Sequence, residues 1–212
     1  ESGLEQLTVM QAGGVVTVST RKGGWSWGRG RLEIKLVVPA GTAIGVRAAS
    51  GDISIFGPAS DVAIEGASGD VHLAAFDGRA RIKTASGDLT VGSAVGELQV
   101  ATASGDVRIG SLNGDFVAGT ASGDISIGSA EGSLSIKTAS GNVGVRRFSG
   151  IHFEGSALSG DFVIGLVPGM SINADFQTRS GSFRNLASAG TSERTINATM
   201  RIKTMSGDIT LR

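Results

Sequence analysis

The stretch TASGDLTVGSAVGELQVATASGDVRIGSLNGDFVAGTASGDISIGSAEG, residues 84–132, repeats Ala-Ser-Gly-Asp at a fixed interval. Ser-Gly pairs recur every 18 residues over six repeats, and a second turn lies nine residues after each pair. The unit is therefore 18 residues long and has two related halves. Repetition at a fixed period is typical of solenoid proteins. The six pairs are followed by Asp52, Asp70, Asp88, Asp106, Asp124 and Asn142.

Each turn is followed by a short segment in which apolar and polar residues alternate. In one repeat Val107 and Ile109 flank Arg108, and the same pattern returns in every unit. A period of two indicates a half-buried strand, and no apolar pattern recurs at 3.6 residues. We predict an all-β fold, a single-domain parallel β-solenoid with two short strands per 18-residue coil and a right-handed turn.

Stacked coils should place equivalent residues in columns ~4.8 Å apart. The aliphatic residues of each strand are expected to point inward. We also expect the alanine before each Ser-Gly pair to point inward, because a small residue is needed where the two sheets converge. Glycine in the turns supplies backbone angles that a Cβ would forbid. The expected inward alanines are Ala67, Ala85, Ala103, Ala121 and Ala139.

The repeat divides the chain into three parts. Residues 46–157 carry the regular 18-residue coils, whereas in residues 158–212 the intervals lengthen around loop insertions before RIKTMSGDITLR closes the sequence. Residues 1–45 lack the repeat and contain longer apolar segments joined by RKGGWSWGRG. We predict that this N-terminal part is a β-hairpin layer that begins or caps the solenoid, all within one continuous domain.

Composition restricts the class of function. The 19 basic and 19 acidic residues cancel, which is untypical of a nucleic-acid-binding surface, so no nucleic-acid partner is expected. There is no cysteine for a disulfide or thiolate metal site. No apolar run is long enough to cross a bilayer, so no membrane insertion is expected. No signal segment is recognised, and either a cytoplasmic or an extracytoplasmic location fits a soluble protein of this composition.

Two segments carry a resemblance to a known family. LVVPAGTAIGVRAASGDISI, residues 36–55, leads into the Ser-Gly-Asp repeats, and IKTMSGDITL, residues 202–211, returns to them at the end. Over residues 30–212 the chain resembles the bacterial adhesin-like family of β-strand-repeat proteins, a domain of unknown function. The resemblance implies a β-solenoid and leaves the activity open.

The column of aspartates is the most visible candidate for chemistry. Neighbouring carboxylates ~4.8 Å apart repel one another by roughly 0.9 kcal/mol in water, so something must offset the repulsion. We favour hydrogen bonds from turn N–H groups, which an amide such as Asn142 would accept equally well. The alternative is a calcium ladder, although calcium prefers six to eight oxygens. That ladder would comprise Asp52, Asp70, Asp88, Asp106 and Asp124.

Catalysis is not expected, and no catalytic or cofactor-binding residue is assigned. The two histidines, His72 on a strand and His152 near a pair of arginines, form no recognisable triad or metal motif. Asp161 and Asp175 are the acids that a polysaccharide-active enzyme would have to use. A Thr-x-Ser ladder, as at Thr102, could match a regular lattice such as ice, or could simply bond along its own column.

One cluster suggests a partner. Trp25, Trp27, Arg29 and Arg31 lie in the Gly-rich turn of the N-terminal part and form a candidate site for a protein or a surface glycan. The two indoles could instead seal the open end of the stack. We therefore expect a non-catalytic structural or binding scaffold. The alternative is a bactofilin-like scaffold that assembles end to end into homo-oligomers through uncapped ends; a polysaccharide-active enzyme or a calcium-binding β-roll is less favoured.

Overall fold

The computed structural model describes residues 6–12, 15–21, 33–187 and 196–212. The chain divides into two compact units, residues 1–37 and 38–212. In the first unit β1 (Gln6–Ala12) and β2 (Val15–Arg21) pair as an antiparallel hairpin. The prediction that residues 1–45 cap the solenoid remains a prediction. The described part of the chain contains no helix long and apolar enough to cross a membrane.

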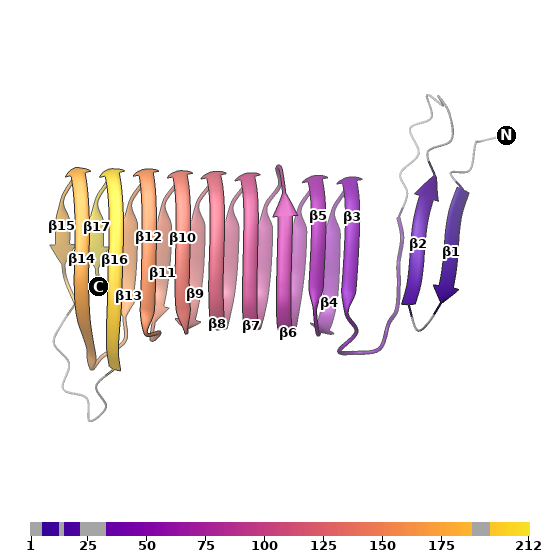
Figure 1. The fold of residues 1–212 in the computed structure, drawn as a ribbon, viewed down its shortest axis with the longest axis horizontal. Coiled ribbons are helices and arrows are strands. Elements are labelled where there is room, and N and C mark those ends of the chain that lie inside the picture. The colour runs from indigo at the N-terminus through magenta and orange to yellow at the C-terminus, as the bar shows by residue number, and fades with distance from the viewer. Residues whose placement is uncertain (1–5, 13–14, 22–32, 188–195) are drawn as a thin grey trace. The chain divides into compact units, whose positions relative to one another are not determined.

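The second unit confirms the predicted fold, an all-β parallel solenoid with 18-residue coils (Figure 1). Each coil crosses a rear face and then a front face, as viewed in that figure. The strands β6 (Val71–Thr84), β7 (Leu89–Ser104) and β8 (Val107–Ser122) cross both faces without a break. In these three coils the two predicted short strands are therefore joined through the second turn.

The remaining strands belong to one face each. The front face contains β3 (Ile44–Ser50), β5 (Val62–Ser68), β10 (Ser133–Ser140), β12 (His152–Ser159), β14 (Met170–Ser180) and β16 (Ile196–Ser206). The rear face contains β4 (Ile53–Ala59), β9 (Ile125–Glu131), β11 (Val143–Phe148), β13 (Phe162–Leu166), β15 (Phe183–Asn185) and β17 (Ile209–Leu211).

The order of the last three coils in space differs from their order in the chain. On the front face β16 lies between β12 and β14, and on the rear face β17 lies between β13 and β15. The closing repeat, residues 196–211, is thus inserted into the stack, and residues 170–185 form the outermost coil (Figure 1). The sequence predicted irregular coils here, but the repeat pattern alone does not reveal this inversion, because every coil offers nearly the same pairing edge.

The core is built from the predicted aliphatic columns, but the alanine column was predicted wrongly. Along β8, Ala118 and Thr120 are buried whereas Gly119 and Ala121 are exposed, because the strand alternates without interruption up to the turn. Threonine, not alanine, is therefore the small inward residue.

Most of the inward threonines are satisfied by their own turn; the exception among the described residues is Thr138, whose buried hydroxyl has no hydrogen-bond partner. The Thr102 hydroxyl donates to the Ser104 carbonyl at 2.9 Å, and Thr120 repeats this contact with Ser122 at 3.0 Å. Because the buried hydroxyl donates to the turn carbonyl, it does not incur the free-energy cost of a buried hydroxyl that lacks a hydrogen-bond partner. Because this column is buried, the Thr-x-Ser ladder does not form the flat exposed lattice considered above.

Candidate functional site

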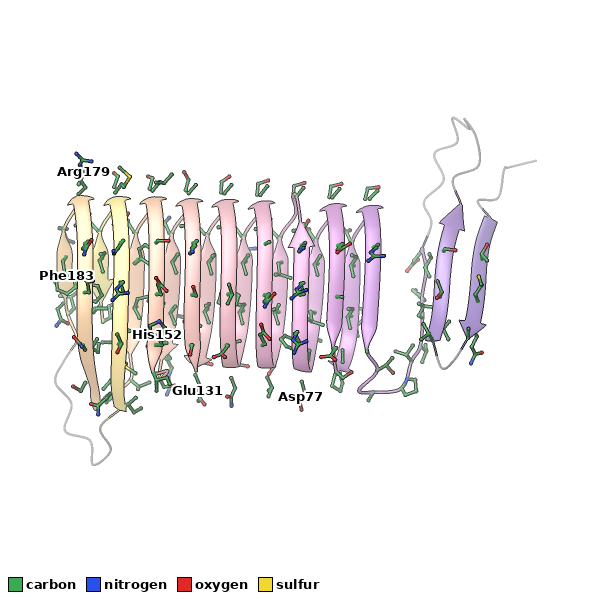
Figure 2. All side chains as sticks on the ribbon, viewed as in Figure 1. Asp77, Glu131, His152, Arg179 and Phe183 are labelled. Carbon is green, nitrogen blue, oxygen red and sulfur yellow. The ribbon has the colours of Figure 1, made fainter. Side chains whose placement is uncertain are left out.

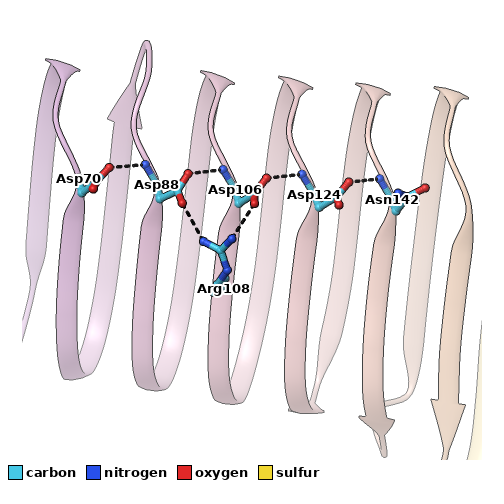
Figure 3. A network of polar contacts seen from close by, with 6 residues as sticks. All are labelled: Asp70, Asp88, Asp106, Arg108, Asp124 and Asn142. Carbon is cyan, nitrogen blue, oxygen red and sulfur yellow. Dashed lines mark hydrogen bonds and ion pairs between the residues drawn. The ribbon is translucent and has the colours of Figure 1, made fainter.

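The aspartates of the Ser-Gly-Asp turns form one hydrogen-bonded ladder (Figure 3). Each Oδ1 accepts the backbone N–H of the equivalent residue in the next coil; for example, Asp106 N donates to Asp88 Oδ1 at 2.9 Å. The same contact continues through the Asn142 amide oxygen, which accepts from Asp161 N at 3.0 Å. The predicted N–H partners are thus present, but they belong to the neighbouring coil, so the ladder links coils rather than closing single turns.

The ladder also follows the inverted order of the last coils. Asp208 N donates to Asp161 Oδ1 at 2.7 Å, and Ser182 N donates to Asp208 Oδ1 at 2.8 Å. The Ser182 backbone N–H and then its hydroxyl lower the pKa of the Asp208 carboxyl. The aspartate of one coil can therefore accept a hydrogen bond from any neighbouring coil that has a Ser-Gly turn followed by a free backbone N–H.

Arg108 reinforces the ladder at its centre. Its guanidinium donates to Asp88 Oδ2 at 2.8 Å and to Asp106 Oδ2 at 2.7 Å (Figure 3). The bond from Arg108, followed by the backbone bond from Asp106, holds the pKa of Asp88 below its ordinary value. One cation between two carboxylates offsets part of the repulsion expected for the column.

The glycine of the turn is required by the coil spacing. At Gly105, φ is +117° and a Cβ would lie 2.1 Å from the Gly87 carbonyl oxygen. The same approach recurs at Gly87, Gly123 and Gly207, so the turns stack backbone on backbone. Ser-Gly-Asp therefore repeats because the glycine permits the contact and the aspartate then bonds across it.

The structure separates the other residues nominated from the sequence. His72 is exposed and pairs with Ser54 of the rear strand β4. His152 is exposed on the front face (Figure 2). Asp161 belongs to the ladder, whereas Asp175 is on the front face, where Arg201 Nε lies 3.4 Å from its Oδ2. Trp25, Trp27, Arg29 and Arg31 lie outside the described residues.

The described residues do not form a recognisable metal site. In that part of the chain no group of three or more His, Asp or Glu side chains is arranged to hold an ion. In the ladder, one oxygen of each carboxylate is already committed to a backbone N–H. The calcium ladder therefore gains no support from this geometry.

A shallow depression lies on the front face. It has a volume of about 640 Å³ and is floored by alanine and glycine residues of neighbouring coils, including Ala67 and Ala85. Arg47 and Glu65 stand at its side, with 3.0 Å between Nε and Oε2. Arg47 and Glu65 offset one another's charge, Lys83 also lines the depression, and the floor exists because the alanine column faces solvent.

Sequence reasoning missed a group of arginines on the rear face. Arg146 and Arg147 lie in β11, Arg184 lies in β15, and Arg212 follows β17. All four are exposed. Stacking brings together residues up to 66 positions apart (212 minus 146), so only the spatial order of the coils reveals this arginine cluster.

The comparisons with known proteins identify a family and nothing closer. No curated protein and no solved structure matches the chain. The model of the family described as Toastrack DUF4097, a domain of unknown function, matches residues 3–212. Because this match covers nearly the whole chain and the fold is a β-solenoid, the chain belongs to the Toastrack DUF4097 family.

Proposed function

We propose that the chain is a non-catalytic scaffold that mediates contacts with another protein or with a surface glycan, as an adhesin-like solenoid would. The observation that carries the proposal is the ladder. Its carboxylates bond from coil to coil along the stack, from Asp52 to Asp208, so the most repeated acidic group of the sequence holds coils in register. The exposed sheet faces are then left for partners.

The pattern of pKa shifts supports the same proposal. In the described residues the shifted groups are Asp88, Arg108 and Asp208, and each shift arises from bonds within or beside the ladder. Active sites are where burial and charge are arranged to move pKa values toward the working pH. Here both carboxyl pKa values move downward, which keeps these groups ionised and unsuited to transferring protons near neutral pH.

The proposal is tested by offering the protein a panel of acidic and neutral polysaccharides and following both retention and polymer length. Retention of at least one polymer without shortening is the expected result. Time-dependent shortening that needs the intact fold would contradict the non-catalytic assignment. A heat-unfolded sample of the same protein is the control for adventitious activity.

End-to-end assembly is the second candidate, and the outermost coil favours it. In the described chain β14 and β15 each pair along one edge only, as do β3 and β4 at the other end of the solenoid. Phe183 is 47% exposed, and its ring lies 4.9 Å from that of Phe176. An open parallel edge beside an exposed apolar ring is a template for a further coil.

Sedimentation velocity over a wide range of concentrations tests this second candidate. Growth with concentration that Phe183→Ser abolishes and Ile151→Ser does not would support assembly through the outermost coil. Ile151 is a matched control because it is also exposed, at 63%, but precedes β12 within the stack. A sample that stays monomeric at every concentration would rule this candidate out.

A further inference from the structure

The arginine cluster differs from the ion-paired groups of the front face. There Arg47 pairs with Glu65 and Arg79 with Glu97, although other front-face cations such as Arg81, which donates to Gln99, form no ion pair within the described part of the chain. In the described residues none of the four clustered arginines forms an ion pair with an acidic side chain. Its positive charge is therefore largely uncompensated by neighbouring side chains.

Stacking gives the cluster a defined spacing. Gly165 lies against Arg146, and a Cβ there would be 2.0 Å from the Arg146 carbonyl oxygen. On the other side of this coil, Arg212 N donates to Ile164 O at 2.9 Å. Arg146 and Arg212 are thus two coil steps of ~4.8 Å apart, with a residue that has no side chain between them.

A low floor adjoins the cluster. Three successive coils carry Gly-Ser at this corner, residues 92–93, 110–111 and 128–129, and the next coil carries Arg146-Arg147 instead. A Cβ at Gly128 would lie 2.3 Å from the Gly110 carbonyl oxygen, so the backbone itself forms the floor. The Arg146 guanidinium reaches back over Gly128, 3.2 Å from where that Cβ would be.

Most other groups on this surface are neutral or distant; the exposed acid at its edge is Glu131, two residues after the Ser129 that pairs with Arg147. The outward residues between the arginines are Gly144, Val163 and Thr210, none of them acidic. The acidic ladder runs four residues before Arg146, a distance of about 13 Å along a strand. Arg184 alone lies close enough to lower the pKa of Asp208, and it is the last of the causes of that shift.

We propose that the arginine cluster and its Gly-Ser floor bind an acidic polysaccharide that runs along the solenoid axis. This rests on the scaffold function proposed above and names the partner class. Guanidinium groups hold carboxylates with paired, charge-assisted hydrogen bonds. The serine hydroxyls, such as Ser111, whose Oγ donates to Ser93 Oγ at 3.2 Å, offer neutral partners for sugar hydroxyls. The Gly-Ser floor carries no aromatic ring for base stacking, which disfavours single-stranded nucleic acid.

The experiment measures the affinity of the full chain for polygalacturonate, with neutral dextran as the uncharged comparison. The double variant Arg146→Ala/Arg147→Ala is compared with Arg81→Ala/Lys83→Ala, which removes the same charge from the outward side of β6 on the front face. We expect salt-sensitive binding of polygalacturonate, a loss of at least tenfold in the rear-face variant, and a change of less than twofold in the front-face variant.

Three results would overturn the inference: no binding of polygalacturonate by the unaltered chain, equal losses in the two double variants, or tighter binding of duplex DNA or phosphatidylglycerol vesicles than of polygalacturonate. Circular dichroism of both variants shows whether the fold is intact. Polymer length is followed in the same samples. Cleavage would contradict the non-catalytic scaffold, whereas absence of binding would contradict only the assignment of this surface.

Discussion

Replacing Gly105 by alanine should destabilise the solenoid far more than its single methyl group suggests. The new Cβ would lie 2.1 Å from the Gly87 oxygen and 2.7 Å from its carbonyl carbon, both backbone atoms that cannot rotate away. The φ of +117° adds strain of about 1–3 kcal/mol for a residue with a side chain. Separating the coils to relieve the clash would also weaken the neighbouring bond from Asp106 N to Asp88 Oδ1, worth about 1 kcal/mol. We expect a total loss of about 2–4 kcal/mol.

Gly119→Ala is the matched control. Gly119 lies in β8, the strand that follows the Gly105 turn, and a Cβ there would meet no atom within 4 Å. Its substitution should change the free energy of unfolding by less than about 1 kcal/mol. The change should be stabilising if its main effect is to reduce the conformational entropy of the unfolded chain. Urea unfolding followed by far-ultraviolet circular dichroism measures both variants. Equal unfolding midpoints for the two variants would refute the argument that coil spacing selects glycine.

Three further outcomes follow from the ladder and the coil order. Asp124→Asn should leave the unfolding midpoint almost unchanged, whereas Asp124→Ala should cost about 1 kcal/mol because one coil-to-coil acceptor is lost; equal costs would show that the carboxylate charge matters more than the hydrogen bond. Because the folded pKa of Asp88 is lowered, its contribution to stability is present above the unfolded pKa and is lost as the pH falls through the lower, folded value. Arg108→Ala should reduce that acid-dependent loss in melting temperature between pH 5 and pH 2, and an unchanged profile would contradict the assignment. Deleting residues 196–212 should release β14 and β15 together, so limited proteolysis should cut within them; if they stay protected, the inserted coil does not hold them.

Much of the architecture follows from the repeat. The 18-residue period and the alternation of Val107, Arg108 and Ile109 predict both the stacking and the buried face, because a period of two fits only a strand. The turn chemistry was also predictable in kind, since aspartate accepts backbone N–H groups readily. The stacking of the coils decides that the bond runs from one coil to the next, because an N–H of the same turn and one of the next coil would serve the carboxylate equally well.

The sequence by itself therefore determined the solenoid, its coil length and the role of glycine in each turn, because these depend on local geometry that recurs in every unit. The structure showed that the alternation of Leu98 and Val100 continues to Thr102, so threonine rather than alanine points inward; one residue of register reverses the face on which a side chain lies. Only the tertiary structure shows that residues 196–211 are inserted between residues 152–166 and residues 170–185. The pairing edges of the coils are nearly identical, so the sequence does not specify the order in which the coils stack. The arginine cluster depends on that order, which places Arg212 two coils from Arg146.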